Sequence, residues 1–465
     1  MKNSILTLVI ILFGSLVNAQ MESSNWYFGD FAGLSFSNGL PEANVNGALT
    51  TWEGCASISS YSGELLFYTD GNKIWNRNHV LMPNGSGLLG NLSSTQSALI
   101  VQKPENDSLY YLFTIDDVAH GNGGSEGLNY SIVNMNLESG LGDVIEEEKN
   151  NHLTSPMCEK VTATKHANGI DVWILCQKWE TNDIYAYLLT AEGIDTEAVI
   201  NSCGTIISGI IDNAKGYMKV SPNSSIIAKA NAGMHTVEIF DFNNSTGSVT
   251  NARVIPDMAG EPYGIEFSPD NKLLYVNTWK NQSGQRLLQY DLEAGDINDI
   301  IASEYIVGTG TNGALQTAPD NKIYIAMNGS GSLSRINQPN KYGPDCDFEF
   351  NSISLGGKTS QYGLPNFPSY IIPPVGEHEL VISTTDINIY PNPNNGRFYL
   401  EVDSSVENAV IELYDLNGKL IWKENVQLIS NLKTNIIDVS FLDKTSYILL
   451  LKTGNKTFST KLFIE

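Results

Sequence analysis

The sequence has few positive charges for its length. Among 465 residues, 27 are lysine or arginine and 51 are aspartate or glutamate, which gives a formal net charge of −24 at pH 7. Binding to nucleic acid phosphates and adsorption to anionic lipid both need clustered lysine and arginine. The composition therefore argues against a nucleic acid partner and against electrostatic adsorption to a membrane, whereas an acidic surface is ordinary for a secreted protein that must stay soluble.

Metal-binding patterns are also scarce. The five cysteines include no CxxC pair, the spacing that zinc sites use, and the six histidines are scattered without the HExxH spacing. We therefore expect no metal and no cofactor. We interpret the cysteines as small buried apolar residues, with Cys158 and Cys176 as the first pair to test for a disulfide.

Only one long apolar run is present. Lys2 precedes it, residues 5–17 are nearly all apolar, and Ala19 ends it with a small side chain. This pattern is typical of a secretory signal peptide, here residues 1–19, which leaves the mature chain. The run is too short for a permanent membrane helix, so we expect no membrane span after cleavage.

Short strands recur at a regular interval through most of the chain. The stretch 268–277, Ser-Pro-Asp-Asn-Lys-Leu-Leu-Tyr-Val-Asn, returns at 318–327 as Ala-Pro-Asp-Asn-Lys-Ile-Tyr-Ile-Ala-Met, with a degraded copy at 221–228. A strand followed by a glycine-containing turn also repeats, at 238–247 and 288–295. Four short strands per unit, at a period of about 40–50 residues, indicate the blades of a β-propeller.

The number of units predicts how the ring closes. Six complete units are followed by one more inner strand over residues 362–367, and aromatic strands between residues 26 and 36 could pair with it. Pairing of the two ends would remove an exposed sheet edge. We predict an all-β fold with a seven-bladed β-propeller over residues 24–370, and six blades as the alternative.

The pattern changes after the propeller region. Residues 371–385 begin with a proline-containing break and are interpreted as a linker. Residues 386–465 alternate short strands with Asn-Gly and Gly-Asn turns, which predicts a small β-sandwich.

This C-terminal module carries a recognisable set of residues: Tyr390, Pro391, Asn392, Pro393, Gly396 and Lys461. In this arrangement they resemble the type A sorting domain of the Bacteroidetes type IX secretion system. The resemblance implies an interaction with that secretion machinery, passage through the outer membrane, and release from the cell or attachment to its surface. The preceding region is similar to uncharacterised surface propeller segments, and 274–278, Leu-Tyr-Val-Asn-Thr, resembles the YVTN repeats of surface-layer propellers.

The repeat register brings out a set of polar residues. Lys219, Glu266 and Gln316 occupy the same position in three successive inner strands. Because inner strands surround the axis of a propeller, we expect a polar belt near the central channel, in which a Lys–Glu pair could have a purely structural role. The alternative is a ligand-binding mouth, extended at the other inner strands by four further residues: Glu53, Gln96, Lys160 and Gln361.

Two hypotheses about function follow. The first is a surface or secreted propeller that binds a glycan or protein without catalysis, since loops carry variable function on a rigid base. The second is an extracellular hydrolase or lyase for polysaccharide or peptide, which requires paired carboxylates or a metal at the channel mouth. No catalytic residue is predicted, because the Gly-x-Ser-x-Gly pattern at 123–127 is not followed by a helix.

Overall fold

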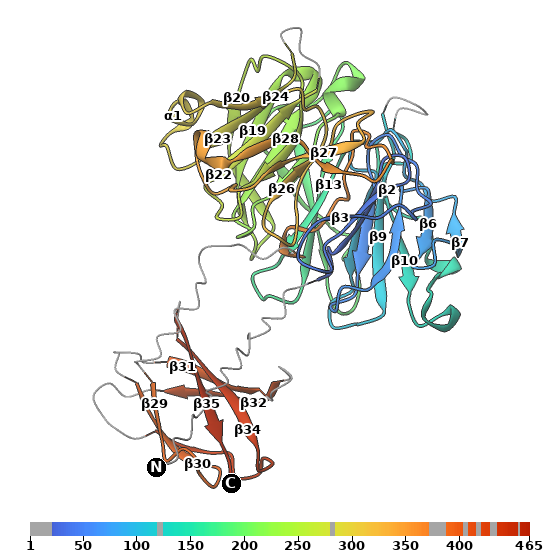
Figure 1. The fold of residues 1–465 in the computed structure, drawn as a ribbon. Coiled ribbons are helices and arrows are strands. Elements are labelled where there is room, and N and C mark those ends of the chain that lie inside the picture. Colours follow the sequence, from blue (N-terminus) through green and yellow to red (C-terminus); the bar gives the residue numbers. More distant parts are fainter. Residues whose placement is uncertain are drawn as a thin grey trace, which may run out of the picture. The chain divides into compact units, whose positions relative to one another are not determined.

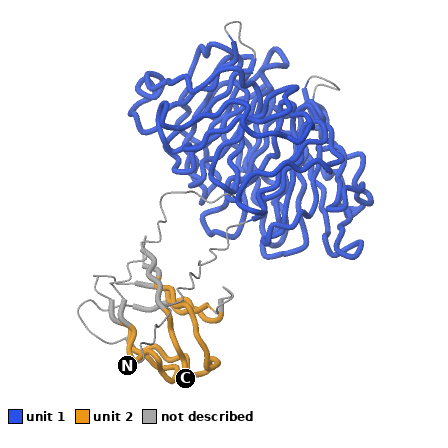
Figure 2. Tube along the Cα trace, in the orientation of Figure 1, with its two compact units in different colours: residues 1–374 blue, residues 375–465 orange. Residues whose placement is uncertain are grey.

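The computed structural model describes residues 21–118, 124–279, 284–371, 387–402, 408–414, 420–427, 435–453 and 456–465. It divides into two compact units, residues 1–374 and 375–465 (Figure 2). The prediction of an all-β fold is confirmed. The predicted signal peptide and nearly all of the predicted linker lie outside the described residues, and the predicted domain boundaries stay predictions. No helix in the described part of the chain is long and apolar enough to cross a membrane.

Seven antiparallel sheets follow one another along the described residues of the first unit (Figure 1). In chain order they contain β1 (Asn25–Phe28), β2 (Ala32–Ser35) and β3 (Glu42–Ala43); β4 (Ala56–Ser59), β5 (Leu65–Thr69), β6 (Lys73–Asn76) and β7 (Leu81–Ser86); β8 (Ala98–Gln102), β9 (Leu109–Ile115), β10 (Leu128–Asn134), β11 (Asp143–Val144) and β12 (Asn151–Thr154); β13 (Met157–Lys165), β14 (Val172–Lys178), β15 (Asp183–Leu189) and β16 (Val199–Ser202); β17 (Met218–Val220), β18 (Ile226–Asn231), β19 (Thr236–Asn243) and β20 (Ser248–Ile255); β21 (Pro262–Phe267), β22 (Leu273–Thr278), β23 (Arg286–Asp291) and β24 (Tyr305–Thr309); β25 (Leu315–Thr317), β26 (Ile323–Ile325), β27 (Ser332–Ile336) and β28 (Phe348–Ser354). A short helix, α1 (Ile297–Ala302), lies between β23 and β24.

The repeated Ser-Pro-Asp-Asn stretch forms the turn between the first two strands of a sheet. Between β21 and β22, Asn271 has φ 68°, and the Ser268 hydroxyl accepts a hydrogen bond from the Leu273 amide at 2.9 Å. The equivalent residues are Asn321 with φ 59° and Ser224 with φ 60°. Asparagine tolerates this left-handed conformation better than most residues, which explains why the turn keeps its sequence in the two clearest copies.

The sheets pack face to face in chain order. The first strands of consecutive sheets are in contact from β4 through β8, β13, β17 and β21 to β25, and β1 contacts β4. Apolar side chains fill the spaces between neighbouring sheets; between the sheets of β13 and β17 they include Trp173, Leu175 and Phe240. Each sheet therefore buries its faces against its neighbours, so several small interfaces replace one large core.

Residues 362–367, the terminal segment, do not form the regular inner strand that the sequence predicts. The segment makes one parallel β-bridge, between Pro365 and Cys55. Proline has no backbone N–H, so Pro365 cannot donate to a strand ladder. The expected pairing with the N-terminal strands is reduced to a bridge between Asp30 and Thr359, just before the segment.

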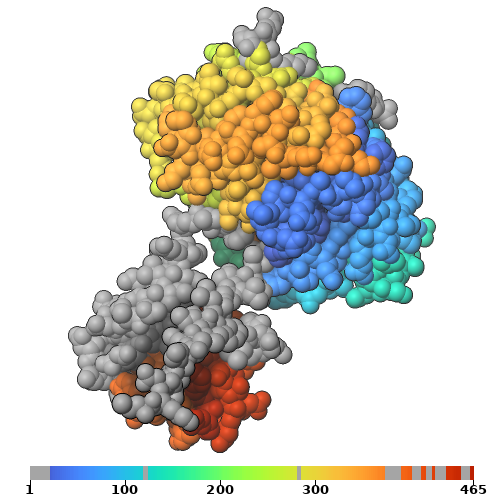
Figure 3. Space-filling view, in the orientation of Figure 1, coloured from blue at the N-terminus to red at the C-terminus, as the bar shows by residue number. Residues whose placement is uncertain are grey.

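The terminal segment instead joins the last sheet to the second. The Tyr362 carbonyl accepts a hydrogen bond from the Ala314 amide at 2.7 Å, and the Tyr362 amide donates to the Trp52 carbonyl at 2.9 Å. Ala314 precedes β25, and Trp52 precedes β4. The space-filling view shows the N-terminal residues in blue directly against orange residues from the end of this unit (Figure 3). The two ends of the first unit are therefore held together.

The second unit contains two sheets. They are built from β29 (Ile387–Tyr390), β30 (Arg397–Val402) and β33 (Asn435–Asp438), and from β31 (Asn408–Tyr414), β32 (Leu420–Gln427), β34 (Ser446–Thr453) and β35 (Lys456–Phe463). Phe398, Ile411, Ile437 and Leu449, from four of these strands, belong to one buried cluster. Apolar residues from the two sheets thus share a single core.

Candidate functional site

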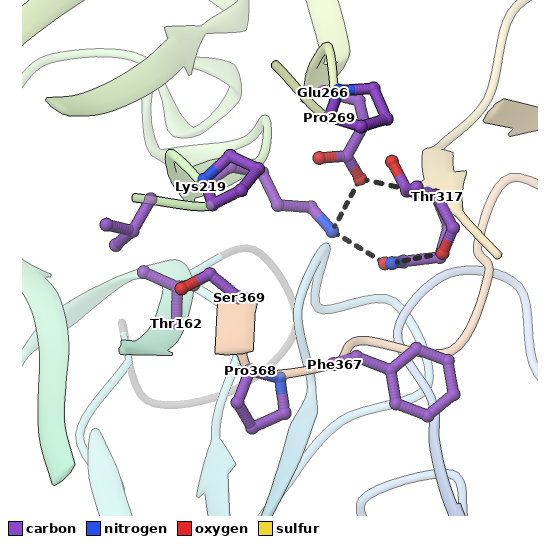
Figure 4. A pocket seen from close by; sticks show the side chains of 11 residues that line it. Thr162, Lys219, Glu266, Pro269, Thr317, Phe367, Pro368 and Ser369 are labelled. Atoms are coloured by element: carbon purple, nitrogen blue, oxygen red, sulfur yellow. Dashed lines mark hydrogen bonds and ion pairs between the residues drawn. The ribbon is translucent and has the colours of Figure 1, made fainter. Parts of the chain in front are cut away.

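Lys219, Glu266 and Gln316 meet at one buried point, as the repeat register predicts. They come from β17, β21 and β25, and each is only 5–7% exposed. Lys219 Nζ lies 2.7 Å from Gln316 Oε1 and 3.4 Å from Glu266 Oε2 (Figure 4). The expected Lys–Glu pair between adjacent sheets is therefore present, and we call these three residues the polar triad.

Backbone groups fix the carboxylate of the triad. Glu266 Oε2 accepts a hydrogen bond from the Thr317 amide at 3.2 Å, and its Oε1 accepts one from the Phe267 amide at 3.1 Å. Burial raises the pKa of Glu266, and the Lys219 charge opposes that rise. The ammonium and carboxylate compensate each other, so the triad is rigid and carries no net charge.

A small pocket opens beside the triad. Its cavity volume is about 30 Å³, which is room for about one or two water molecules. Apolar walls come from five residues: Val220, Pro222, Pro269, Phe367 and Pro368. Thr162, Thr317 and Ser369 add hydroxyl groups around the triad (Figure 4). The terminal segment thus contributes directly to the pocket through Phe367.

The other four predicted site residues lie elsewhere. Gln96 accepts a hydrogen bond from the Met218 amide at 2.8 Å, and Lys160 Nζ donates to two backbone carbonyls. Gln361 Nε2 donates to Asp30 Oδ2 at 2.7 Å. None of these four residues, which would extend the ligand mouth, is among the described residues that line the pocket beside the triad. The turn after β13 closes with a hydrogen bond from the His166 amide, and the matching turn after β17 closes with one from the Ser221 amide. Counting back two residues from each makes Thr164, and not Lys160, the equivalent of Lys219.

Glu53 belongs to a second polar cluster that the sequence did not predict. Glu53 Oε2 accepts hydrogen bonds from the Tyr263 hydroxyl at 2.9 Å and from the Thr95 hydroxyl at 3.3 Å. The same Thr95 hydroxyl lies 2.9 Å from Glu159 Oε2. Two buried carboxylates therefore lie close together around one hydroxyl. The available signal was the charged Glu159–Lys160 pair at the start of an apolar strand.

This carboxylate pair is electrostatically unusual. Burial, followed by the charge of Glu159, raises the pKa of Glu53 to about 8. Burial also raises the pKa of Glu159 to about 7, although hydrogen bonds from Thr95 and the charge of Lys215 oppose the rise. Lys215 is itself paired with Asp212 at 2.8 Å and lies 5.2 Å from the centre of the Trp279 ring.

The raised pKa values predict that the carboxylate pair makes stability depend on pH. Each carboxyl group has a higher pKa in the folded protein than its unfolded value of 4.5, so the folded state binds the proton more tightly. The resulting stabilisation is fully present below pH 4.5 and is lost as the pH rises through about 7 to 8. We expect Glu53→Gln to abolish much of this loss of stability. At pH 8.5 the free energy of unfolding of the variant should then exceed that of the wild type by a few kcal/mol. Chemical denaturation at pH 5.0 and 8.5 measures the difference.

The control for this pH experiment is Glu293→Gln, which changes an exposed partner of Lys272. It should leave the pH dependence of stability unchanged. If the free energy of unfolding falls equally between pH 5.0 and 8.5 in the wild type and in Glu53→Gln, the pH-dependent stability does not come from this pair.

The predicted sorting residues lie at the end of β29, in the loop between β29 and β30, and, for Lys461, on β35. Asn392 Nδ2 donates to the Lys461 carbonyl at 2.6 Å, and Asn392 Oδ1 accepts from the Phe463 amide at 2.8 Å. Tyr390 stacks on Tyr399 with ring centroids 5.4 Å apart. Gly396 has φ 88°, and a Cβ there would lie 2.4 Å from Ser440 Cα. The motif therefore fastens the last strand, β35, to the first loop of this unit.

The described architecture defines an all-β repeat protein with a separate C-terminal β unit. Residues 388–465 match the family described as secretion system C-terminal sorting domain, which confirms the resemblance found in the sequence. This domain implies an interaction with the type IX secretion system and export to the cell surface or extracellular space.

Solved structures offer only distant likenesses. A functionally unknown protein from Desulfotomaculum acetoxidans is 14% identical, with 75% of this chain and 88% of that one covered and a TM-score of 0.38. The periplasmic gluconolactonase of Pseudomonas aeruginosa is 13% identical, and the match covers 80% of this chain and 98% of the gluconolactonase with a TM-score of 0.38. TolB from Acinetobacter baumannii is 13% identical, and the match covers 64% of this chain and 79% of TolB with a TM-score of 0.32. These likenesses carry no argument about function. No curated protein matches the chain significantly.

Proposed function

We propose that the first unit is a seven-bladed β-propeller that binds a glycan or protein outside the cell without catalysing a reaction. Seven consecutive sheets, the ordered contacts between their first strands, and the hydrogen bonds of Tyr362 to both ends of the series support the closed ring. Blades of this kind supply a rigid base for recognition at the ends of the channel.

The pocket beside the polar triad is the observation that carries the binding function. Three sheets contribute one residue each to the triad, and only one carboxylate, Glu266, lines the pocket. Hydrolysis of a glycoside by the usual route needs two carboxyl groups flanking the bond. A preorganised neutral pocket with one carboxylate fits recognition better than hydrolysis.

The alternative function is that of an extracellular hydrolase or lyase for polysaccharide or peptide. Its catalytic groups would be Glu53 and Glu159, whose raised pKa values would suit acid–base catalysis. Against this, Glu53 is 5% exposed and Glu159 is 0% exposed. Internal hydroxyl groups already contact both carboxylates. The pair therefore has the arrangement of a structural cluster more than that of an open active site.

One experiment compares the two functions on the full mature chain. The purified protein is applied to a glycan array and a peptide array and, in parallel, is assayed for turnover of the same compounds. We expect binding without turnover, and at least a tenfold loss of affinity in Gln316→Met, which removes one of the two side-chain acceptors of Lys219. Gln338→Met, at an exposed glutamine, is the control. Turnover that Glu53→Gln abolishes would establish the alternative, and no binding to any compound would refute the proposal.

A further inference from the structure

Thr162 leaves an unmet hydrogen-bonding requirement in the pocket beside the triad. It lies on β13, is 1% exposed, and lines the pocket. Within the described part of the chain, its Oγ1 has no hydrogen-bond partner. Buried hydroxyl groups nearly always have a partner, so an occupant of the pocket is the natural source of one.

Lys219 offers a matching donor. A lysine ammonium has three N–H donors, and the structure gives it two side-chain acceptors, Gln316 and Glu266. Nζ also lies 5.9 Å from the centre of the Tyr217 ring. The described residues offer no third hydrogen-bond acceptor, so one N–H remains for a group in the pocket. Figure 4 shows Lys219 extending into the centre of the view, with Thr162 and Ser369 on another side of the pocket.

The charge balance selects a neutral occupant. Glu266 compensates the Lys219 ammonium, so a carboxylate or phosphate would approach a site with no positive charge in excess. A hydroxyl group accepts one hydrogen bond and donates another, which suits Lys219 and Thr162 together. The cavity of about 30 Å³ admits only a small terminal group.

The walls favour a sugar over a peptide. Pro222, Pro269 and Pro368 surround the pocket, and proline has no backbone N–H with which to pair an extended peptide. Proline rings and Phe367 present apolar surface, on which the C–H groups of a sugar can pack. A serine or threonine side chain of a peptide would satisfy the hydroxyl requirement but would find few main-chain donors around it.

We propose that this pocket recognises the terminal hydroxymethyl group of a neutral glycan, with the hydroxyl accepting a hydrogen bond from Lys219 and donating one to Thr162 Oγ1. This inference rests on the proposed binding function and names its ligand class. It assigns Thr162 as a specificity residue, because its hydroxyl has no other partner among the described residues.

The test compares three sets of probes on the full mature chain. They are oligosaccharides that end in D-galactose, D-glucose or D-mannose, the same compounds with a 6-deoxy terminal sugar, and the same compounds with a terminal uronic acid. We expect at least tenfold weaker binding of both modified sets. Thr162→Val should bind all three sets with similar weak affinity, whereas Thr162→Ser should keep the preference of the wild type.

The melting temperature separates a folding defect from a binding defect. Because the Thr162 hydroxyl has no partner among the residues that the structure describes, Thr162→Val should unfold at or above the wild-type temperature. Preference for the uronic acids, or an unchanged preference in folded Thr162→Val, would overturn the hydroxymethyl assignment while leaving the binding function intact. Binding of serine-containing peptides but of no sugar would overturn the glycan class. Absence of all binding would refute the proposed function itself.

Discussion

Replacement of Gly363 by alanine should prevent the first unit from folding normally. A Cβ at this position would lie 1.6 Å from the Glu53 carbonyl oxygen and 2.4 Å from the carbonyl carbon. Both atoms belong to the main chain, so no side-chain rotation can relieve the clash. We expect the free energy of unfolding to fall by more than about 4 kcal/mol, which is an exceptionally large effect for one added methyl group. The yield of soluble protein and the thermal unfolding curve measure this effect.

Gly331→Ala is the matched control for the Gly363 experiment. The nearest atom to a Cβ at Gly331 is the Lys358 carbonyl oxygen at 3.9 Å, an ordinary contact. The free energy of unfolding of this variant should differ from that of the wild type by less than about 0.5 kcal/mol. If Gly363→Ala unfolds at the wild-type temperature, the terminal segment does not pack against the backbone of the second sheet as described.

Deletion of residues 386–465 should abolish export to the cell surface. Residues 388–465 match the sorting domain family, and the first unit has its own buried clusters. The truncated protein should therefore fold but accumulate in the periplasm, with a surface fraction at least tenfold below that of the full chain. Cell fractionation, with an antibody against the first unit, measures its distribution.

Two point variants make the export experiment more specific. Asn392→Ala removes the hydrogen bonds to Lys461 and Phe463 and should reduce surface delivery. Ile436→Ser changes a side chain that is 62% exposed and should leave delivery unchanged. Normal surface delivery of the truncated chain would show that the sorting assignment is wrong.

The repeat register predicted the polar triad because the turns of three consecutive units align. The turns at Ser224, Asn271 and Asn321 align β17, β21 and β25, so residues at equal distances from these turns come together. The same transfer failed for Lys160, because the turn that follows β13 begins at His166 and makes Thr164 the equivalent of Lys219. That turn reads His-Ala-Asn-Gly and lacks the Ser-Pro-Asp-Asn pattern, so the alignment of β13 could not be set from the sequence alone.

The carboxylate pair could not be predicted in the same way. Glu53, Thr95 and Tyr263 precede or begin three different sheets, and no shared motif connects them. Their contacts depend on how neighbouring sheets pack against one another, which a repeat alignment does not contain. The order of the repeat units predicts one more inner strand at the terminal segment, although Pro365 prevents a regular ladder there.

The position of Asn366 also constrains the order of folding. Its side chain donates to the Ala98 and Val161 carbonyls and accepts from Gln96 Nε2, 270 residues earlier in the sequence. These contacts cannot form until nearly the whole first unit has left the ribosome, and contacts so distant in sequence slow folding. We therefore expect the contacts of Asn366 with the third and fourth sheets to form late in folding.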